Sequence, residues 1–134
     1  MTRIAVFGTF DIFHPGHISF LQQAKRQGDY LLVIVARDHH VQLAKGNNPR
    51  NTAAKRAQAV RRAEIADKVV LGSRTHNYFQ TLRTYKINKI VLGYDQKPSQ
   101  VELKKALKGH RLGGIEISRA RAYNPGKFKS SKLS

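Results

Sequence analysis

The sequence predicts an α/β fold in which a parallel five-stranded sheet carries helices on both faces, within a single domain. Short apolar runs alternate with helical patterns in the order β-α-β-α-β-α-β-α-β, which is typical of a parallel sheet with right-handed crossovers. A length of 134 residues and a hydrophobic content of 40% suit one ordinary domain, and we expect that domain to span residues 1–134.

The first three predicted elements form a strand–helix–strand unit. Ile4–Phe7 is a short apolar run that indicates a buried strand. Gly16–Gln27 carries apolar residues at helical spacing, and Gly28 follows it as a stop signal. Tyr30–Ala36 is continuous, apolar and rich in β-branched residues, so we expect a central strand that is buried on both faces.

The rest of the chain alternates in the same way. Arg37–Asn51 is typical of a loop, and Thr52 is the predicted N-cap of a helix over Ala53–Ala63. We then expect a strand over Lys68–Leu71, a helix over Tyr78–Tyr85, a strand over Lys89–Leu92, a helix over Val101–Leu107 capped by Ser99, and a last strand over Gly114–Ser118.

The composition points to an anionic ligand. Against 25 Lys and Arg stand 8 Asp and Glu, a net charge of +17 that attracts phosphorylated small molecules, nucleotides or nucleic acid. A solvated basic surface would explain the total equally well. The absence of cysteine excludes disulfides and thiolate metal sites. Since no apolar run could span a bilayer or act as a signal peptide, we expect a cytoplasmic protein with no membrane contact.

The stretch GTFDIFHPGH, from Gly8 to His17, joins the first strand to the first helix. In a parallel sheet this turn lies beyond the carboxyl end of a strand, where ligands bind. Gly8 allows close approach of the backbone to a ligand, and Pro15 suits the first helical turn. The free N–H groups of that turn predict a phosphate site. His14 and His17 would flank the phosphate and stabilise the charge that builds up on it during a reaction.

The polar residues of this stretch also suit two other roles. Asp11 could hold Mg²⁺ or orient a neighbouring group. The histidines could bind a metal, but a pair at this spacing lacks further ligands, so metal binding by the protein alone is not favoured.

The same stretch resembles the G-x-F-D-x-x-H-x-G-H signature of the cytidylyltransferase-like nucleotidyltransferases, and the resemblance extends over essentially the whole chain. It implies a Rossmann-like fold and the transfer of a nucleoside monophosphate to a phosphorylated acceptor with release of pyrophosphate. It also implies a divalent cation such as Mg²⁺, with ATP or CTP as substrate. The residues that it places at the nucleotide are His14, His17, Gly8, Thr9, Phe10 and Gly16.

Further segments match the family in the same way. Asp38 ends the second strand at the mouth of the site, and Lys45 and Arg56 resemble the basic residues that approach the phosphates of nucleotide or acceptor, with Lys45 as a catalytic residue. In LGYDQ (Leu92–Gln96), Asp95 could accept from a ribose hydroxyl or base amino group. The nucleotide-binding residues implied here are Gly93, Tyr94, Asp95 and Gln96, with Arg121 (or Arg119) and the hydroxyls of Ser130 and Ser131 on the terminal phosphates.

The string LGYDQ is similar to that of the archaeal-type FAD synthetases, which favours ATP and FMN as substrates. Alternatives of the same chemistry are CTP with glycerol 3-phosphate and ATP with a sugar phosphate. A non-catalytic nucleotide sensor or a nucleic-acid-binding module would belong to another class. The latter is not favoured, because the chain has no helix-turn-helix or RNA-binding signature. The resemblance is also compatible with a homodimer.

Overall fold

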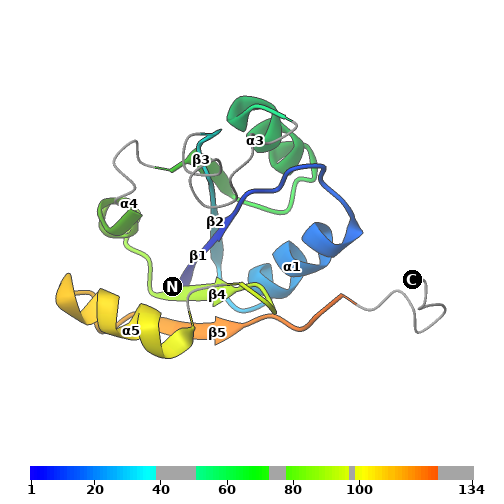
Figure 1. The fold of residues 1–134 in the computed structure, drawn as a ribbon. Helices are drawn as coiled ribbons and strands as arrows, with labels where there is room; N and C mark the ends of the chain where they lie inside the picture. Colours follow the sequence, from blue (N-terminus) through cyan, green and yellow to red (C-terminus); the bar gives the residue numbers. More distant parts are fainter. Residues whose placement is uncertain (39–50, 73–77, 97–98, 124–134) are drawn as a thin grey trace.

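The computed structural model describes residues 1–38, 51–72, 78–96 and 99–123, and these ranges contain one parallel sheet of five strands (Figure 1). The predicted parallel, five-stranded architecture is therefore confirmed. The strands lie side by side in the order β3-β2-β1-β4-β5. Their bounds are Arg3–Gly8 for β1, Tyr30–Val35 for β2, Lys68–Leu71 for β3, Lys89–Leu92 for β4 and Glu116–Arg119 for β5.

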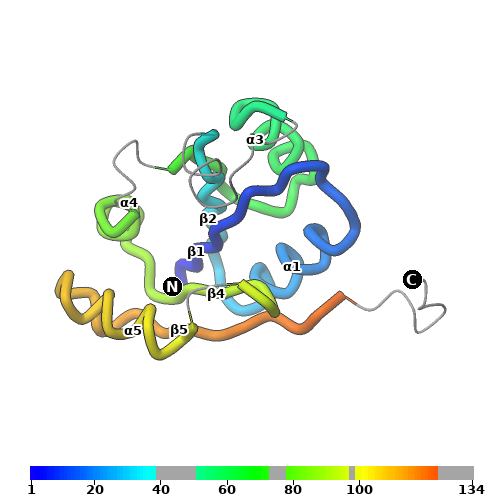
Figure 2. The backbone as a smooth tube through the Cα atoms, in the orientation of Figure 1, coloured from blue at the N-terminus to red at the C-terminus, as the bar shows by residue number. Residues whose placement is uncertain are grey.

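The strand order creates a switch point beside β1. The chain moves outward from β1 to β2 and β3, and then returns to place β4 on the other side of β1. In the register, Gly8 pairs with Val35 of β2, and Ile4 pairs with Lys89 of β4. Ligands of such sheets bind beyond the carboxyl ends of the strands at this point. The backbone trace shows the turn after β1 leading directly into α1 at that edge (Figure 2).

Helices cover both faces of the sheet, as predicted. On one face α1 (Pro15–Lys25) and α3 (Ala53–Arg62) bury Leu21 and Val60 against the strands. On the other, α4 (Tyr78–Thr84) and α5 (Gln100–Gly109) bury Leu82, Leu103 and Leu107. Each strand of the centre alternates its side chains between these two apolar layers. No helix within the described ranges is long and apolar enough to cross a membrane.

The predicted element bounds differ from the observed ones mainly at the ends. The first helix begins at Pro15 rather than Gly16, because His14 is its N-cap. The last strand covers Glu116–Arg119 rather than Gly114–Ser118, since Glu116 is the residue that pairs with the start of β4. The remaining helices and strands begin or end within two residues of their predicted bounds, as fraying of element ends leads one to expect.

Candidate active site

The turn between β1 and α1 is held in a strained conformation. Phe10 and Ile12 have φ angles of 54° and 51°, in the left-handed region that side chains other than glycine avoid. The Phe10 ring is buried and lies where a Cβ on Gly8 would be, 2.6 Å from the ring's Cε2. Glycine at position 8 therefore makes room for the Phe10 ring, and the expected close approach of a ligand to the Gly8 backbone stays a prediction.

His14 and His17 cap α1 reciprocally. The Nδ1 atom of His14 accepts a hydrogen bond from the backbone N–H of Gly16 at 3.1 Å. The Nδ1 atom of His17 accepts one from the backbone N–H of His14 at 3.2 Å. The two imidazoles stack, with ring centroids 3.8 Å apart. The predicted meeting of both histidines at the N-terminus of this helix is therefore what the structure contains.

This arrangement fixes the chemistry of both rings. An Nδ1 atom that accepts a hydrogen bond carries no proton, so each neutral imidazole has its proton on Nε2. Each ring then offers an Nε2–H donor at the positive end of a helix. Donors fixed in this way can stabilise charge on a phosphate without reorganising first.

Two phenylalanines support His17. The Phe13 ring stacks on the His17 imidazole, with centroids 5.5 Å apart and planes 19° apart, and Phe10 meets the same imidazole edge-on at 5.3 Å. Sequence reasoning assigned no role to Phe13. A signal was available, because Phe13 and His17 are four residues apart across the start of a helix, a spacing that brings side chains together.

Asp11 accepts two hydrogen bonds from Asn51, which lies two residues before α3. Its Oδ1 atom accepts hydrogen bonds from the backbone N–H of Asn51, at 3.1 Å, and from the Asn51 side-chain amide, at 3.2 Å. The contact ties the turn after β1 to the residue before the Thr52 N-cap. The described residues contain no group of three or more His, Asp or Glu side chains that could hold a metal ion. Magnesium binding by Asp11 stays a prediction.

Arg56 is buried beneath the site, with 1% of its surface exposed. Its Nη1 atom donates to the carbonyls of Thr9 and Ala36, each at 2.8 Å, and its Nε atom donates to Asn51 at 3.0 Å. Its Nη2 atom donates to Asp38 at 2.6 Å, in an ion pair. These bonds hold together the chain after β1, the chain after β2 and α3. Direct contact of Arg56 or Asp38 with an acceptor phosphate stays a prediction.

The side-chain amide of Gln96 shapes the loop that follows β4. The Oε1 atom of Gln96 accepts from the Gly93 N–H at 2.9 Å, and its Nε2 atom donates to the Phe7 carbonyl of β1 at 3.0 Å. Arg119 donates from Nη1 to the carbonyls of Gly93 and Gln96, at 2.7 and 2.9 Å. The amide of Gln96 thus shapes the loop, and its expected contact with the nucleotide stays a prediction.

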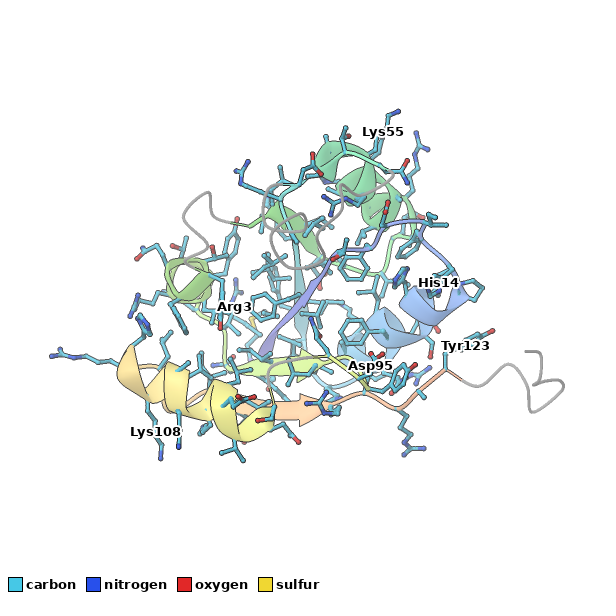
Figure 3. All side chains as sticks on the ribbon, viewed as in Figure 1. Arg3, His14, Lys55, Asp95, Lys108 and Tyr123 are labelled. Atoms are coloured by element: carbon cyan, nitrogen blue, oxygen red, sulfur yellow. The ribbon has the colours of Figure 1, made fainter. Side chains whose placement is uncertain are left out.

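The rest of this loop faces solvent. Tyr94 and Asp95 are exposed, and Figure 3 shows Asp95 at the end of β4, toward the same end of the molecule as His14 at the start of α1 (Figure 3). Arg121 is exposed in the segment after β5. Lys45, Ser130 and Ser131, three of the predicted site residues, lie outside the described residues.

A protein-family model described as cytidylyltransferase-like matches residues 5–133 of the chain. The chain belongs to the cytidylyltransferase-like family. It is accordingly a nucleotidyltransferase enzyme, as the GTFDIFHPGH stretch predicts.

Relatives of this family member in archaea carry the name FAD synthase. One from Pyrococcus abyssi is 38% identical over 131 residues, which cover 98% of this chain and 88% of that protein. One from Methanosarcina barkeri is 43% identical over 107 residues, or 80% of this chain and 75% of that protein.

A solved structure supports the Rossmann-like assignment of this cytidylyltransferase-like chain. The lipopolysaccharide core biosynthesis protein from Thermoplasma volcanium has a TM-score of 0.85 at 32% identity, with 92% of this chain and 98% of that one covered. The pantoate-beta-alanine ligase from Francisella tularensis, at 15% identity, shares the fold with a TM-score of 0.60, over 97% of this chain and 66% of that one.

Proposed function

We propose that the protein transfers AMP from ATP to FMN, giving FAD and pyrophosphate. The relatives called FAD synthase, alignable over 98% of the chain, support this choice of substrates. The structural observation that carries the proposal is the reciprocal cap of His14 and His17. With both Nδ1 atoms accepting, each neutral imidazole carries its proton on Nε2 at a helix N-terminus beyond the carboxyl end of β1, where a polyphosphate would be bound.

The proposed reaction is a direct in-line transfer. A phosphate oxygen of FMN attacks the α-phosphorus of ATP, and the bond from that phosphorus to the bridging oxygen breaks, so that pyrophosphate leaves with the electron pair. A phosphate monoester is already an anion at neutral pH, so no strong general base is needed. Catalysis then rests on positioning and on charge stabilisation by His14, His17 and Lys45.

Other predicted residues have supporting roles in this scheme. Mg²⁺ would enter with the phosphates of the nucleotide, where it would offset their charge. Asp95 and the backbone of Gly93 would contact the nucleoside, and Arg121, Ser130 and Ser131 the terminal phosphates. Arg56 would act by fixing Asp38 and the backbone of Thr9. The cytoplasm as location and a homodimer as assembly belong to the proposal as well.

The direct test is pyrophosphate release by the purified protein with Mg²⁺, crossing ATP and CTP against FMN, glycerol 3-phosphate and a sugar phosphate. The expected result is release with ATP plus FMN only, with FAD as the second product. Release with CTP and glycerol 3-phosphate, or with ATP and a sugar phosphate, would replace the substrates and keep the chemistry. Binding of ATP with no release from any pair would contradict catalysis and favour a nucleotide sensor.

His17 offers a test of the mechanism. We expect His17→Gln to lower turnover by about a hundredfold or more, the scale of a lost oxyanion donor. Glutamine at this third helical position can still accept from the His14 N–H, as in an ordinary capping box, so the helix should remain capped. His110→Ala is the control, because His110 stacks on Phe79 in the other helical layer. Turnover by His17→Gln within a few-fold of the unmodified protein would contradict the mechanism.

A further inference from the structure

The chain that follows β5 is held by a side chain rather than by a strand. Ala120 still donates its N–H to the Leu92 carbonyl of β4 at 2.8 Å, which extends the sheet by one residue. At Arg121 the partner changes. The Arg121 N–H donates to Oε1 of Gln23 at 2.8 Å, and the Arg121 carbonyl accepts from Nε2 of Gln23 at 3.1 Å.

Both bonds come from one amide, so Gln23 pairs with Arg121 as a peptide group of a neighbouring strand would. The amide of Gln23 is itself oriented, because Nε2 also donates to the hydroxyl of Ser19, one turn earlier in α1, at 3.2 Å. One turn later, Gln27 accepts from the Ser118 hydroxyl at 2.9 Å. Gln23 in α1 and Gln27 just after that helix therefore contact β5 and the residues that follow it.

The paired segment runs toward the catalytic end of α1. Two residues after Arg121, the Cβ of Tyr123 lies 3.9 Å from the position that a Cβ on Gly16 would take, in the first turn of the helix. Gln23 lies almost two turns later in the same helix. Figure 3 shows Tyr123 near the end of α1 that carries His14, and Figure 2 shows residues after β5 passing along that helix.

We propose that Gln23 is a positioning residue of the nucleotidyl transfer: its amide holds residues 121–123 along α1, so that Tyr123 stays beside the helical turn that carries the histidine pair and Arg121 stays two residues before it. The inference rests on the proposed function for its kinetic consequence only. Arg121 would otherwise leave the sheet with its backbone N–H and carbonyl exposed to water. Its guanidinium would then sample many positions, and charge stabilisation of a bound triphosphate would lose its preorganisation.

The test uses Gln23→Met, which keeps the length and helix propensity of the side chain and removes both hydrogen bonds to Arg121 together with the bond to Ser19. The matched control is Gln22→Met, because Gln22 precedes Gln23 in the same helix and its side chain is exposed. We expect the KM for ATP to rise about tenfold in Gln23→Met, the effect of losing two hydrogen bonds, with a much smaller change in kcat. Gln22→Met should match the unmodified protein in both constants.

A second readout does not depend on activity. The chain contains no tryptophan, so Tyr123→Trp introduces a single reporter into the segment. We expect tryptophan anisotropy to be lower, and acrylamide quenching stronger, in Tyr123→Trp/Gln23→Met than in Tyr123→Trp/Gln22→Met.

Equal anisotropy and quenching in the two proteins would overturn the inference. So would a lower anisotropy in Tyr123→Trp/Gln23→Met without any rise in the KM of Gln23→Met. An unmodified protein that made no FAD would instead contradict the proposed function and leave the fluorescence comparison decisive for the role of Gln23 in holding the segment.

Discussion

At the scale of single residues, the site depends on close fits around two glycines. The Phe10 ring fills the space above Gly8, and the His14 ring fills the space above Gly16. A Cβ on Gly16 would lie 2.8 Å from Cε1 of His14 and 3.0 Å from its Nδ1, which is the atom that caps the helix. The position of the His14 imidazole therefore requires glycine at position 16, whether or not a ligand also approaches there.

Gly16→Ala should consequently act through His14. The added methyl group displaces the ring, and we expect turnover to fall by on the order of a hundredfold, since a shift of about 1 Å at a reacting site has that effect. The measurement is steady-state pyrophosphate release. Gly109→Ala in α5 is the control, because nothing lies within 4 Å of its Cβ position. Equal turnover in the two variants would show that the His14 ring position does not matter.

At the scale of elements, Arg56 of α3 forms hydrogen bonds to the backbone just after two neighbouring strands. The carbonyls of Thr9 and Ala36 follow β1 and β2, and both accept from the same Nη1 atom. A guanidinium can do this because it presents several donors in a rigid plane, whereas an ammonium is a compact point charge on a flexible stem. The site thus rests on a buried cation whose charge is balanced by Asp38.

Arg56→Met should destabilise the protein by about 3 kcal/mol, because it leaves three part-buried carbonyls and the half-exposed Asp38 carboxylate without their partner. Urea denaturation followed by circular dichroism measures this. Arg62→Met, on an exposed position of the same helix, should shift the free energy of unfolding by less than about 0.5 kcal/mol. If Arg56→Met kept the free energy of unfolding of the unmodified protein and lost only affinity for the acceptor, the role of Arg56 would instead be direct contact with the acceptor phosphate.

At the scale of the whole molecule, most positive charge is left without a carboxylate partner. Between the described residues there are two ion pairs, Arg56–Asp38 and Lys25–Asp67, in a chain of net charge +17. The second pair links α1 to the residue before β3. Burial by itself would raise the pKa of Asp67, but Lys25 and the Leu31 N–H, which donates at 2.8 Å, more than offset it and lower the pKa below 3.8.

A lowered pKa in the folded state means that the Asp67 carboxylate stabilises the protein above the unfolded-state pKa, and that this contribution is lost as the pH falls through the folded-state value. Asp67→Asn should therefore be less stable than the unmodified protein at pH 7, by less than about 1 kcal/mol because the pair is over a third exposed. The difference should vanish in acid below the folded-state pKa. Urea midpoints of both proteins across this range are the measurement, and a difference that persisted in acid would exclude the ion pair as its cause.

The sequence by itself determined the element order, the parallel sheet and the pairing of His14 with His17. Apolar periodicity and capping residues act over a few neighbours along the chain, so they can be seen without coordinates. Placing GTFDIFHPGH at the carboxyl edge of a central strand followed from the same local patterns together with the rules of sheet topology.

Only the tertiary structure decided how the segments of the site are joined. Gln23 meets Arg121 across 98 residues, Asn51 meets Asp11 across 40, and Arg119 meets Gly93 across 26. Hydrogen bonds between such distant residues leave no period in the sequence, and a glutamine or arginine looks the same there whether it contacts solvent, substrate or backbone. The structure likewise showed that Gln96 and Arg56 bond to backbone groups of distant segments, partners that only the folded chain brings within reach; their contacts with nucleotide or acceptor stay predictions.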